Sequence, residues 1–235
     1  MKTIKYPSEQ RGHANYGWLQ ARYSFSFSNY YNPENIHFGV LRVLNDDIIQ
    51  PGMGFGTHPH DNMEIITIPL KGALMHQDSM GHQSVIKSGE VQVMSAGTGI
   101  RHSEFNASEE DALNLFQIWI FPYRHGLKPR YDQKRFEFES GKPTLLVSPD
   151  NRENSLSINQ DAFISRLLLE EGETYDYQLY SEDNGAFMIV IDGTATIAGE
   201  NFTARDALTV TDSSLITIES QTKLDLLILE VPIKL

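Results

Sequence analysis

The chain of 235 residues contains no cysteine and relatively few basic residues. Without cysteine it has no disulfide framework, no thiolate metal site and no thiol nucleophile. Lysine and arginine together number 19 against 31 aspartate and glutamate residues, which gives a formal net charge of −12. Such a surface repels phosphate backbones, so we expect no direct binding to nucleic acid.

Long hydrophobic runs are missing as well. No apolar stretch is long enough to cross a bilayer. The first residues, 1–9, contain no apolar segment of the kind that signal peptides carry. We therefore expect a cytoplasmic protein without a membrane partner.

Helical periodicity is weak along the whole chain, and the one helix that the sequence suggests is a short one near residues 157–161. Short apolar runs between glycine, proline, asparagine and aspartate turns predict many antiparallel strands instead. That spacing indicates a sandwich or barrel rather than βαβ units. The predicted strands are residues 37–44, 63–70, 73–77, 83–87, 91–94, 113–121, 163–169, 175–179, 186–191, 194–198, 207–210, 215–218 and 224–231.

The strands fall into two halves that resemble each other in layout. Between them lies a charged segment with several prolines, residues 122–143, which we interpret as a linker. The first half includes Asn45, Asp46 and Asp47, which we take to end a strand. The likeness of the halves indicates an internal duplication, in which one small barrel is built twice. The predicted fold class is all-β.

Residues suited to metal binding gather in one stretch, residues 52–106. His58 and His60 form one pair, separated by a single residue. His102 and Glu104 form a second such pair, at the end of another predicted strand. Residues two apart on a strand project from the same face, so two facing strands can enclose one ion. Imidazole and carboxylate suit divalent ions such as iron, nickel, copper, zinc or manganese, and four protein ligands leave open positions on an octahedral ion.

Glu64 has the same parity as the first histidine pair. It is either a further ligand or a residue that fixes a histidine tautomer, and the spacing leaves both roles open. Its neighbours Phe55 and Met63, with Met94, Phe116 and the aromatic residues before residue 35, are candidates for a pocket lining or for ordinary core. The other histidines lack a partner at ligand spacing and are interpreted as surface or core residues: His13, His37, His76, His82 and His125. For His76 a place at the edge of the barrel interior is also open, because it lies on a predicted strand that could border it.

The same stretch resembles the two signature motifs of the cupin family. The first motif, G-x5-H-x-H-x3,4-E-x6-G, is matched, with one extra residue before its last glycine, by Gly52, His58, His60, Glu64 and Gly72. The second, G-x5-P-x-G-x2-H-x3-N, is matched by Gly89, Gly97, His102 and Asn106. Ser95 replaces its proline, and two more residues precede the histidine. These departures resemble the pirin branch of the cupins, and especially the bacterial pirin-like proteins described as quercetin 2,3-dioxygenases.

The resemblance implies a bicupin, with two tandem double-stranded β-helix (jelly-roll) barrels. We expect an N-terminal metal-binding cupin in residues 1–130 and a C-terminal metal-free cupin in residues 131–235. The ligand set that the resemblance implies is His58, His60, His102 and Glu104. Glu64 then becomes a residue that supports the ligands. Iron is the first choice of ion, ahead of nickel, copper, cobalt, manganese and zinc.

An alignment of the two halves tests the second barrel. If the hairpin glycines Gly72 and Gly193 correspond, poor ligands occupy the positions that match the first histidine pair and Glu64. These positions are Leu179, Ser181 and Gly185. No histidine follows His125 in the sequence. The C-terminal cupin is therefore expected to bind no metal.

The resemblance favours an oxygenase. A flavonol such as quercetin would be cleaved by O2 with release of carbon monoxide, and Glu104 would act as the general base. The alternative is a metal-binding regulatory or redox-sensing pirin that acts through protein partners. A third reading keeps the oxygenase chemistry but gives it another aromatic substrate, since a shared fold does not fix function.

Overall fold

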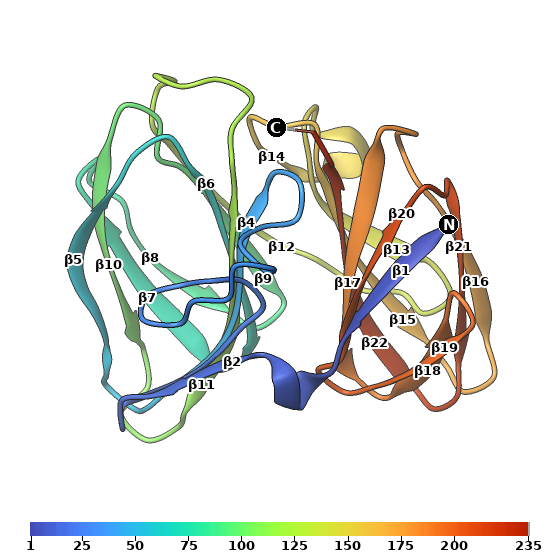
Figure 1. Ribbon diagram of the computed structural model, residues 1–235. Helices are drawn as coiled ribbons and strands as arrows, with labels where there is room; N and C mark the ends of the chain where they lie inside the picture. Colours follow the sequence, from blue (N-terminus) through green and yellow to red (C-terminus); the bar gives the residue numbers. More distant parts are fainter. Residues whose placement is uncertain (235) are drawn as a thin grey trace.

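The computed structural model describes residues 1–234 and consists of two barrels that lie side by side (Figure 1). The strands of the first barrel are β2 (Gly12–Asn15), β3 (Leu19–Tyr23), β4 (Leu41–Ile49), β5 (Gly54–His60), β6 (Glu64–Lys71), β7 (Ala73–Asp78), β8 (Gln83–Lys87), β9 (Glu90–Ser95), β10 (Ile100–Asn106), β11 (Leu113–Ile120) and β12 (Arg130–Arg135). They form a seven-stranded sheet in the order β12-β9-β6-β11-β4-β3-β2 and a four-stranded sheet in the order β5-β10-β7-β8.

The second barrel repeats this plan. Its strands are β1 (Lys2–Tyr6), β13 (Pro143–Ser148), β14 (Leu156–Ser157), β15 (Phe163–Leu169), β16 (Thr174–Gln178), β17 (Asn184–Asp192), β18 (Thr194–Ile197), β19 (Glu200–Thr203), β20 (Ala207–Thr211), β21 (Leu215–Ser220) and β22 (Leu224–Pro232). The sheet orders are β1-β20-β17-β22-β15-β13-β14 and β16-β21-β18-β19. The strand orders of the two barrels correspond except at the edge beyond β4 and β15, where β2 and β3 pair antiparallel but β13 and β14 pair parallel. The shared order supports the duplication.

The N-terminal strand crosses to the other barrel. β1 pairs with β20 at the edge of the second barrel's sheet, where β12 pairs with β9 in the first barrel. A single turn of 3-10 helix, η1 (Ser8–Gln10), then carries the chain back to β2 (Figure 1). The division of the chain at residue 130 stays a prediction. The strand pairing adds that Lys2–Tyr6 joins the large sheet of the second barrel, and that Arg130–Arg135 joins the large sheet of the first barrel.

Three local predictions are wrong. The residues expected to form a helix, 157–161, contain no helix, because Leu156 and Ser157 pair with β13 and the following residues turn into β15. The segment interpreted as a linker, residues 122–143, contains β12, which the pairing with β9 holds in the sheet. Asn45, Asp46 and Asp47 continue β4 instead of ending it. Apart from η1, the 3-10 helix η2 (Arg152–Asn154) is the one further helical element in residues 1–234, and neither is long and apolar enough to cross a membrane.

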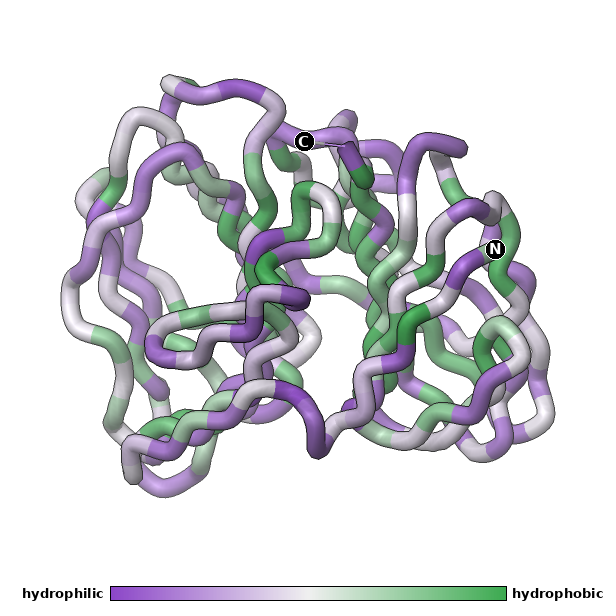
Figure 2. The backbone as a smooth tube through the Cα atoms, viewed as in Figure 1, coloured by the Kyte–Doolittle hydropathy of each residue, from purple (hydrophilic) through white to green (hydrophobic). Residues whose placement is uncertain are grey.

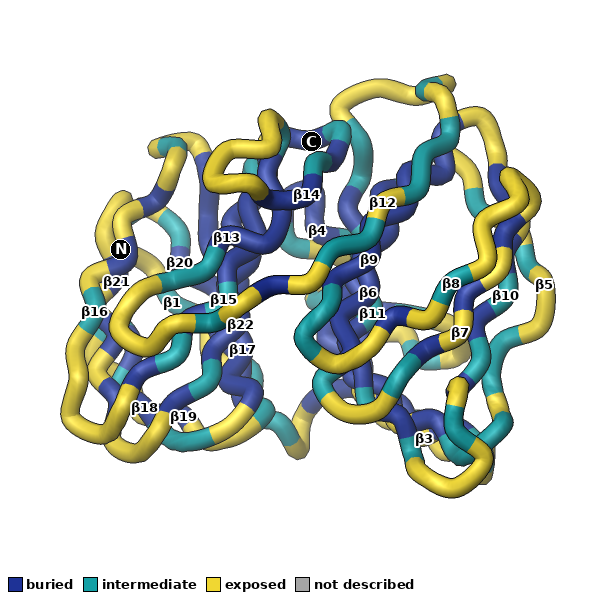
Figure 3. Tube along the Cα trace, turned by 180° about the vertical axis from the view of Figure 1, so that it is seen from behind, coloured by how far each residue is buried: buried dark blue, intermediate teal, exposed yellow. Residues whose placement is uncertain are grey.

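The largest apolar core lies between the barrels. Ile66 and Phe116 from the first barrel and Phe187 and Leu229 from the second belong to one buried cluster. Hydrophobic residues concentrate along the strands where the barrels meet (Figure 2), and the same strands are buried (Figure 3). Each such side chain contributes about 1.5–3 kcal/mol by leaving water. One face of each large sheet is thereby used for the contact, and the other face lines the interior of its own barrel.

Candidate metal centre

The predicted ligand pairs lie on two neighbouring antiparallel strands. His58 on β5 is directly opposite His102 on β10, and a bulge follows that places Glu104 opposite Phe55. The strands approach so closely here that a Cβ atom added at Gly54 would lie 2.2 Å from the carbonyl oxygen of Glu104. Glycine at position 54 therefore permits the pairing that brings the two halves of the site together.

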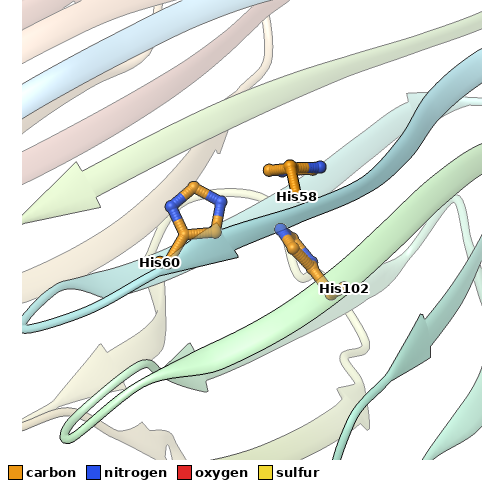
Figure 4. Close-up of side chains that lie close together, drawn as sticks. All are labelled: His58, His60 and His102. Atoms are coloured by element: carbon orange, nitrogen blue, oxygen red, sulfur yellow. The ribbon is translucent and has the colours of Figure 1, made fainter.

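Three histidines form a compact cluster inside the first barrel (Figure 4). The ring centroids of His58 and His102 are 4.4 Å apart, those of His58 and His60 4.9 Å, and those of His60 and His102 4.8 Å. One ring nitrogen from each histidine lies within 4.8 Å of the other two. This spacing suits convergence on a single small cation.

The histidines are held in the form that binds metals. The Nδ1 atom of His58 lies 2.8 Å from the carbonyl oxygen of Gly56, so Nδ1 carries the proton and Nε2 keeps its lone pair. Burial, assisted by the neighbouring histidines, lowers the pKa of His102 to about 2. Burial and His58 lower the pKa of His60 to about 4. Neither ring nitrogen of His102 has a hydrogen-bond partner among the described residues. This donor set fits a divalent ion.

Glu104 lies beside His102 and lines the same cavity as the three histidines. Its carboxylate forms a second potential metal group with His102 and His76, again within 4.8 Å, and does not belong to the three-histidine group. Gln117 Nε2 donates to it at 3.1 Å. Burial raises the pKa of Glu104 to about 7, against the effect of hydrogen bonds from Gln117 and Thr67. The assignment of four ligands to one ion stays a proposal.

His76, for which the sequence left surface and core open, lies in the core beside the site. It is opposite Glu104 on β7, and its ring centroid is 5.3 Å from that of His102. Gln92 Nε2 lies 3.3 Å from its Nδ1 atom, and its Nε2 atom lies 3.4 Å from a carboxylate oxygen of Asp78. Alternate residues of β7 are buried, namely Leu74, His76 and Asp78. The period-2 alternation of a strand was therefore the available sign that His76 faces the interior. The other four histidines in question are exposed: His13, His37, His82 and His125.

Glu64 plays neither role that the sequence left open. It accepts hydrogen bonds from Ser95 Oγ at 2.7 Å and Asn159 Nδ2 at 3.0 Å, and it belongs to neither metal group. Residues 61–63 separate β5 from β6 and break the alternation that gave Glu64 the parity of His60. The interpretation of Glu64 as a support for the ligands is therefore wrong. Since Asn159 follows β14 of the second barrel, Glu64 instead links the two barrels.

The histidines open into a cavity of about 320 Å³. Phe27, Phe55 and Trp119 form its aromatic walls, whereas Met63, Met94 and Phe116 do not line it. Sequence reasoning missed the lining residues Asn45, Asp47, Gln117 and Trp119. Continued period-2 alternation through β4 and β11 places all four on the interior face, and that alternation was the available signal.

Besides the ring nitrogens of His102, two polar atoms in the cavity wall have no hydrogen-bond partner in the described chain, namely Trp119 Nε1 and Asp47 Oδ1. Burial raises the pKa of Asp47 to about 8, helped by Asp46 and Glu104. A neutral carboxyl at this position donates as well as accepts. The wall therefore offers polar partners to a ligand as well as apolar area.

The strand register locates the equivalent positions in the second barrel. Counted from the hairpin glycines, His76 matches Ile197, whose partner Ile218 then matches Glu104. Two residues earlier on the same strand, Ile216 matches His102. Ile216 pairs with Tyr177, and in the first barrel His102 pairs with His58. His58 thus corresponds to Tyr177 and His60 to Leu179.

The sequence alignment of the halves was therefore wrong by two residues at the histidine pair, whereas the match of Glu64 with Gly185 lies after the loop and is unaffected. The loop before β6 comprises residues 61–63 and the loop before β17 comprises residues 179–183, so the second loop is two residues longer. The prediction that the second barrel binds no metal stays a prediction. Its physical basis is that apolar side chains and a tyrosine occupy the ligand positions.

Comparison with known proteins agrees with this arrangement. The family model Pirin matches residues 6–120, and a model described as the quercetinase C-terminal cupin domain matches residues 145–231. A quercetin 2,3-dioxygenase from Escherichia coli (strain K12) is 45% identical over 225 residues, 96% of each chain. The chain belongs to the pirin family. A further relative of this pirin, a putative quercetin 2,3-dioxygenase from Pseudomonas aeruginosa, is 42% identical over 96% of this chain and 97% of the relative.

Solved structures confirm the bicupin fold of this pirin. The crystal structure of YhhW from Escherichia coli superposes with a TM-score of 0.95 at 43% identity and covers 98% of both chains. A structure of bacterial pirin YhhW in complex with nickel(II) gives a TM-score of 0.94 at 42% identity and covers 98% of this chain and 99% of that one. These likenesses and the histidine cluster together support a divalent metal ion as cofactor, without deciding which ion.

Proposed function

We propose that this pirin is a metal-dependent dioxygenase that cleaves a flavonol with O2 and releases carbon monoxide. The observation that carries the proposal is a three-histidine cluster at the wall of an aromatic cavity, in which His58 and His60 are half-buried and His102 is buried with both ring nitrogens unpartnered in the described chain. The names of the curated relatives give the same reaction class. They lend no support to the regulatory alternative.

His58, His60 and His102 would hold the ion, with Glu104 at its flank as the fourth ligand. When bound, a divalent ion supplies Lewis acidity that favours the deprotonated form of a substrate hydroxyl. Iron remains our first choice, and the nickel(II) complex of a relative makes nickel the next ion to test.

Glu104 would accept the proton of that hydroxyl. Its carboxylate lines the same cavity as the histidines, and Gln117 Nε2 donates a hydrogen bond to it at 3.1 Å. A positioned carboxylate within reach of the reacting group is suited to general base catalysis. Gln117 would act as a positioning residue.

The cavity suits a planar, hydroxylated aromatic substrate. Its volume, about 320 Å³, lies at the small end of the range for ligand pockets. Phe27, Phe55 and Trp119 offer flat apolar contacts, and the unpartnered Trp119 Nε1 and Asp47 Oδ1 atoms offer hydrogen bonds to hydroxyl groups. The aromatic walls thus suit the flat rings of a flavonol, and the unpartnered polar atoms suit its hydroxyl groups.

The test is anaerobic incubation of metal-loaded protein with quercetin, followed by addition of O2. Loss of flavonol absorbance together with release of carbon monoxide is the expected result. The protein should be loaded separately with iron, nickel, copper, cobalt or manganese. Absence of turnover with every ion would overturn the proposal, and turnover without carbon monoxide would leave an oxygenase with a different cleavage reaction.

A further inference from the structure

A second cavity, of about 390 Å³, lies in the seam between the barrels. Its walls come from β2, β3, β4 and β11 of the first barrel, from the turn before β20 of the second, and from the η1 segment that crosses between them. Three arginines line it: Arg11, Arg22 and Arg205. Such a concentration of positive charge stands out in a chain whose formal net charge is −12.

Arg11 is the most deeply placed of the three. It is only 6% exposed, and Nη2 donates to the carbonyl oxygen of Arg22 at 3.2 Å. Its Nε and Nη1 atoms have no hydrogen-bond partner among the described residues. Burial lowers the pKa of Arg11 to about 10, so it remains charged at neutral pH. A buried, incompletely paired guanidinium is costly for the folded state and is relieved by an anionic partner.

Arg205 reaches the cavity from the second barrel. Its backbone has a φ of 71° in the turn between β19 and β20. Nη1 donates to Asp46 Oδ2 at 3.2 Å and Nη2 donates to Asn114 Oδ1 at 3.1 Å. Asn114 Nδ2 in turn donates to Asp46 Oδ1 at 2.8 Å. Both carboxylate oxygens of Asp46 are thus engaged.

The balance of charge in the cavity is positive. Three arginines face two acidic residues, the already paired Asp46 and the exposed Glu9. The cavity is also separate from the histidine cluster, because adjacent residues on a strand point to opposite faces. Asp46 faces the seam, whereas Asp47 faces the metal cavity.

We propose that the seam cavity binds a small anion that carries a phosphate or a carboxylate group. Guanidinium groups present paired N–H donors that match both kinds of oxyanion. The cavity has room for an organic molecule as well as for the anionic group itself. The bound anion would contact both barrels, since Arg22 belongs to the first and Arg205 to the second.

Isothermal titration calorimetry of the 235-residue chain with inorganic phosphate and with citrate tests the proposal. Arg22→Gln and Arg205→Gln should each weaken binding by at least about tenfold, because each removes a charge-assisted hydrogen bond. Glu9→Gln should strengthen binding, since it removes a negative charge from the wall. Arg135→Gln is the matched control, because Arg135 is exposed on β12 at the opposite side of the first barrel's large sheet from β3.

Opposite effects of the arginine and glutamate substitutions support the site. Binding of phosphate alone identifies phosphate as the recognised group, and binding of citrate alone identifies carboxylate. Arg22 is exposed, so Arg22→Gln keeps the test valid if Arg205→Gln does not fold. Absence of binding for both anions at millimolar concentration would overturn the proposal. An equal loss in Arg135→Gln would also overturn it, because the effect would then reflect net charge alone.

Discussion

The two barrels differ in the side chains that occupy the ligand positions of their interiors. In the second barrel, Tyr177, Ile197, Ile216 and Ile218 belong to one continuous apolar core. The matching positions of the first barrel hold the residues of the candidate site: His58, His76, His102 and Glu104. Here the apolar residues form two separate clusters, one around Leu74 and Ile86 and one around Ile65 and Met94.

The difference shows where the fold obtains its stability. A polar interior with unpartnered atoms costs free energy, and functional sites generally carry such a cost. The second barrel and the core between the barrels provide the compensating burial. One copy of the duplicated barrel can therefore carry chemistry because the other copy and their contact supply packing.

The largest expected effect is loss of the metal site. His102→Ala removes the residue that belongs to both potential metal groups, so metal content should fall to background. Elemental analysis of the purified protein measures this, with His125→Ala as the control because His125 is exposed outside the cluster. Metal removal by a chelator should also lower the melting temperature of the wild type, because an ion that binds the folded state stabilises it. Retention of metal by His102→Ala would move the site elsewhere.

A smaller loss, confined to turnover, is expected for Glu104→Gln. Quercetin cleavage should fall about 10²- to 10⁴-fold, the usual contribution of a general base. Metal content should stay well above that of His102→Ala, because the three histidines remain. Anaerobic binding of quercetin, followed by absorbance, separates lost binding from lost chemistry. Unchanged turnover would remove Glu104 from the proton transfer.

The corresponding residue of the second barrel should affect stability instead. Ile218→Ala leaves a cavity in a fully buried core and should lower the free energy of unfolding by about 2–5 kcal/mol. Leu215→Ala on the same strand, where Leu215 is 43% exposed, should change it by less than about 0.5 kcal/mol. Urea unfolding measures both values. A loss of metal in folded Ile218→Ala would contradict the separation of roles between the barrels.

The sequence predicts the features that depend on local pattern. Strand alternation, turn residues and the spacing of the two ligand pairs indicate the duplicated barrel and bring His58, His60 and His102 together. What it misses depends on distant parts of the chain. The pairing of Lys2–Tyr6 with β20 has no local signal, and neither has the bulge after His102 that places Glu104 opposite Phe55.

Asp46 and Asp47 illustrate the same limit. Their composition is typical of a turn, yet both residues continue β4, and their surroundings come from distant parts of the chain. Arg205, far along the chain, donates to Asp46, and Asp47 lies in the wall of the metal cavity. Tertiary contacts thus override the local preference for a turn.

The smallest effect concerns a buried carboxylate in the second barrel. Glu230 is fully buried, but it is well satisfied: it accepts hydrogen bonds from the backbone N–H groups of Tyr180 and Ser181, from Asn184 Nδ2 and from the Tyr177 hydroxyl. Burial still raises its pKa, and the hydrogen bonds only partly offset that rise.

A raised pKa in the folded state means that ionisation of Glu230 opposes folding. The stability that the protonated Glu230 contributes is fully present below the unfolded-state pKa. It is lost as pH rises through the folded-state pKa. Glu230→Gln should therefore flatten the decline of unfolding free energy above pH ~4.5. Urea unfolding of metal-free wild type and variant between mildly acidic and neutral pH gives the difference. A steeper decline in the variant would show that the four hydrogen bonds outweigh burial, and that the second barrel holds Glu230 as an anion, unlike Asp47 of the first barrel, whose pKa burial raises to about 8.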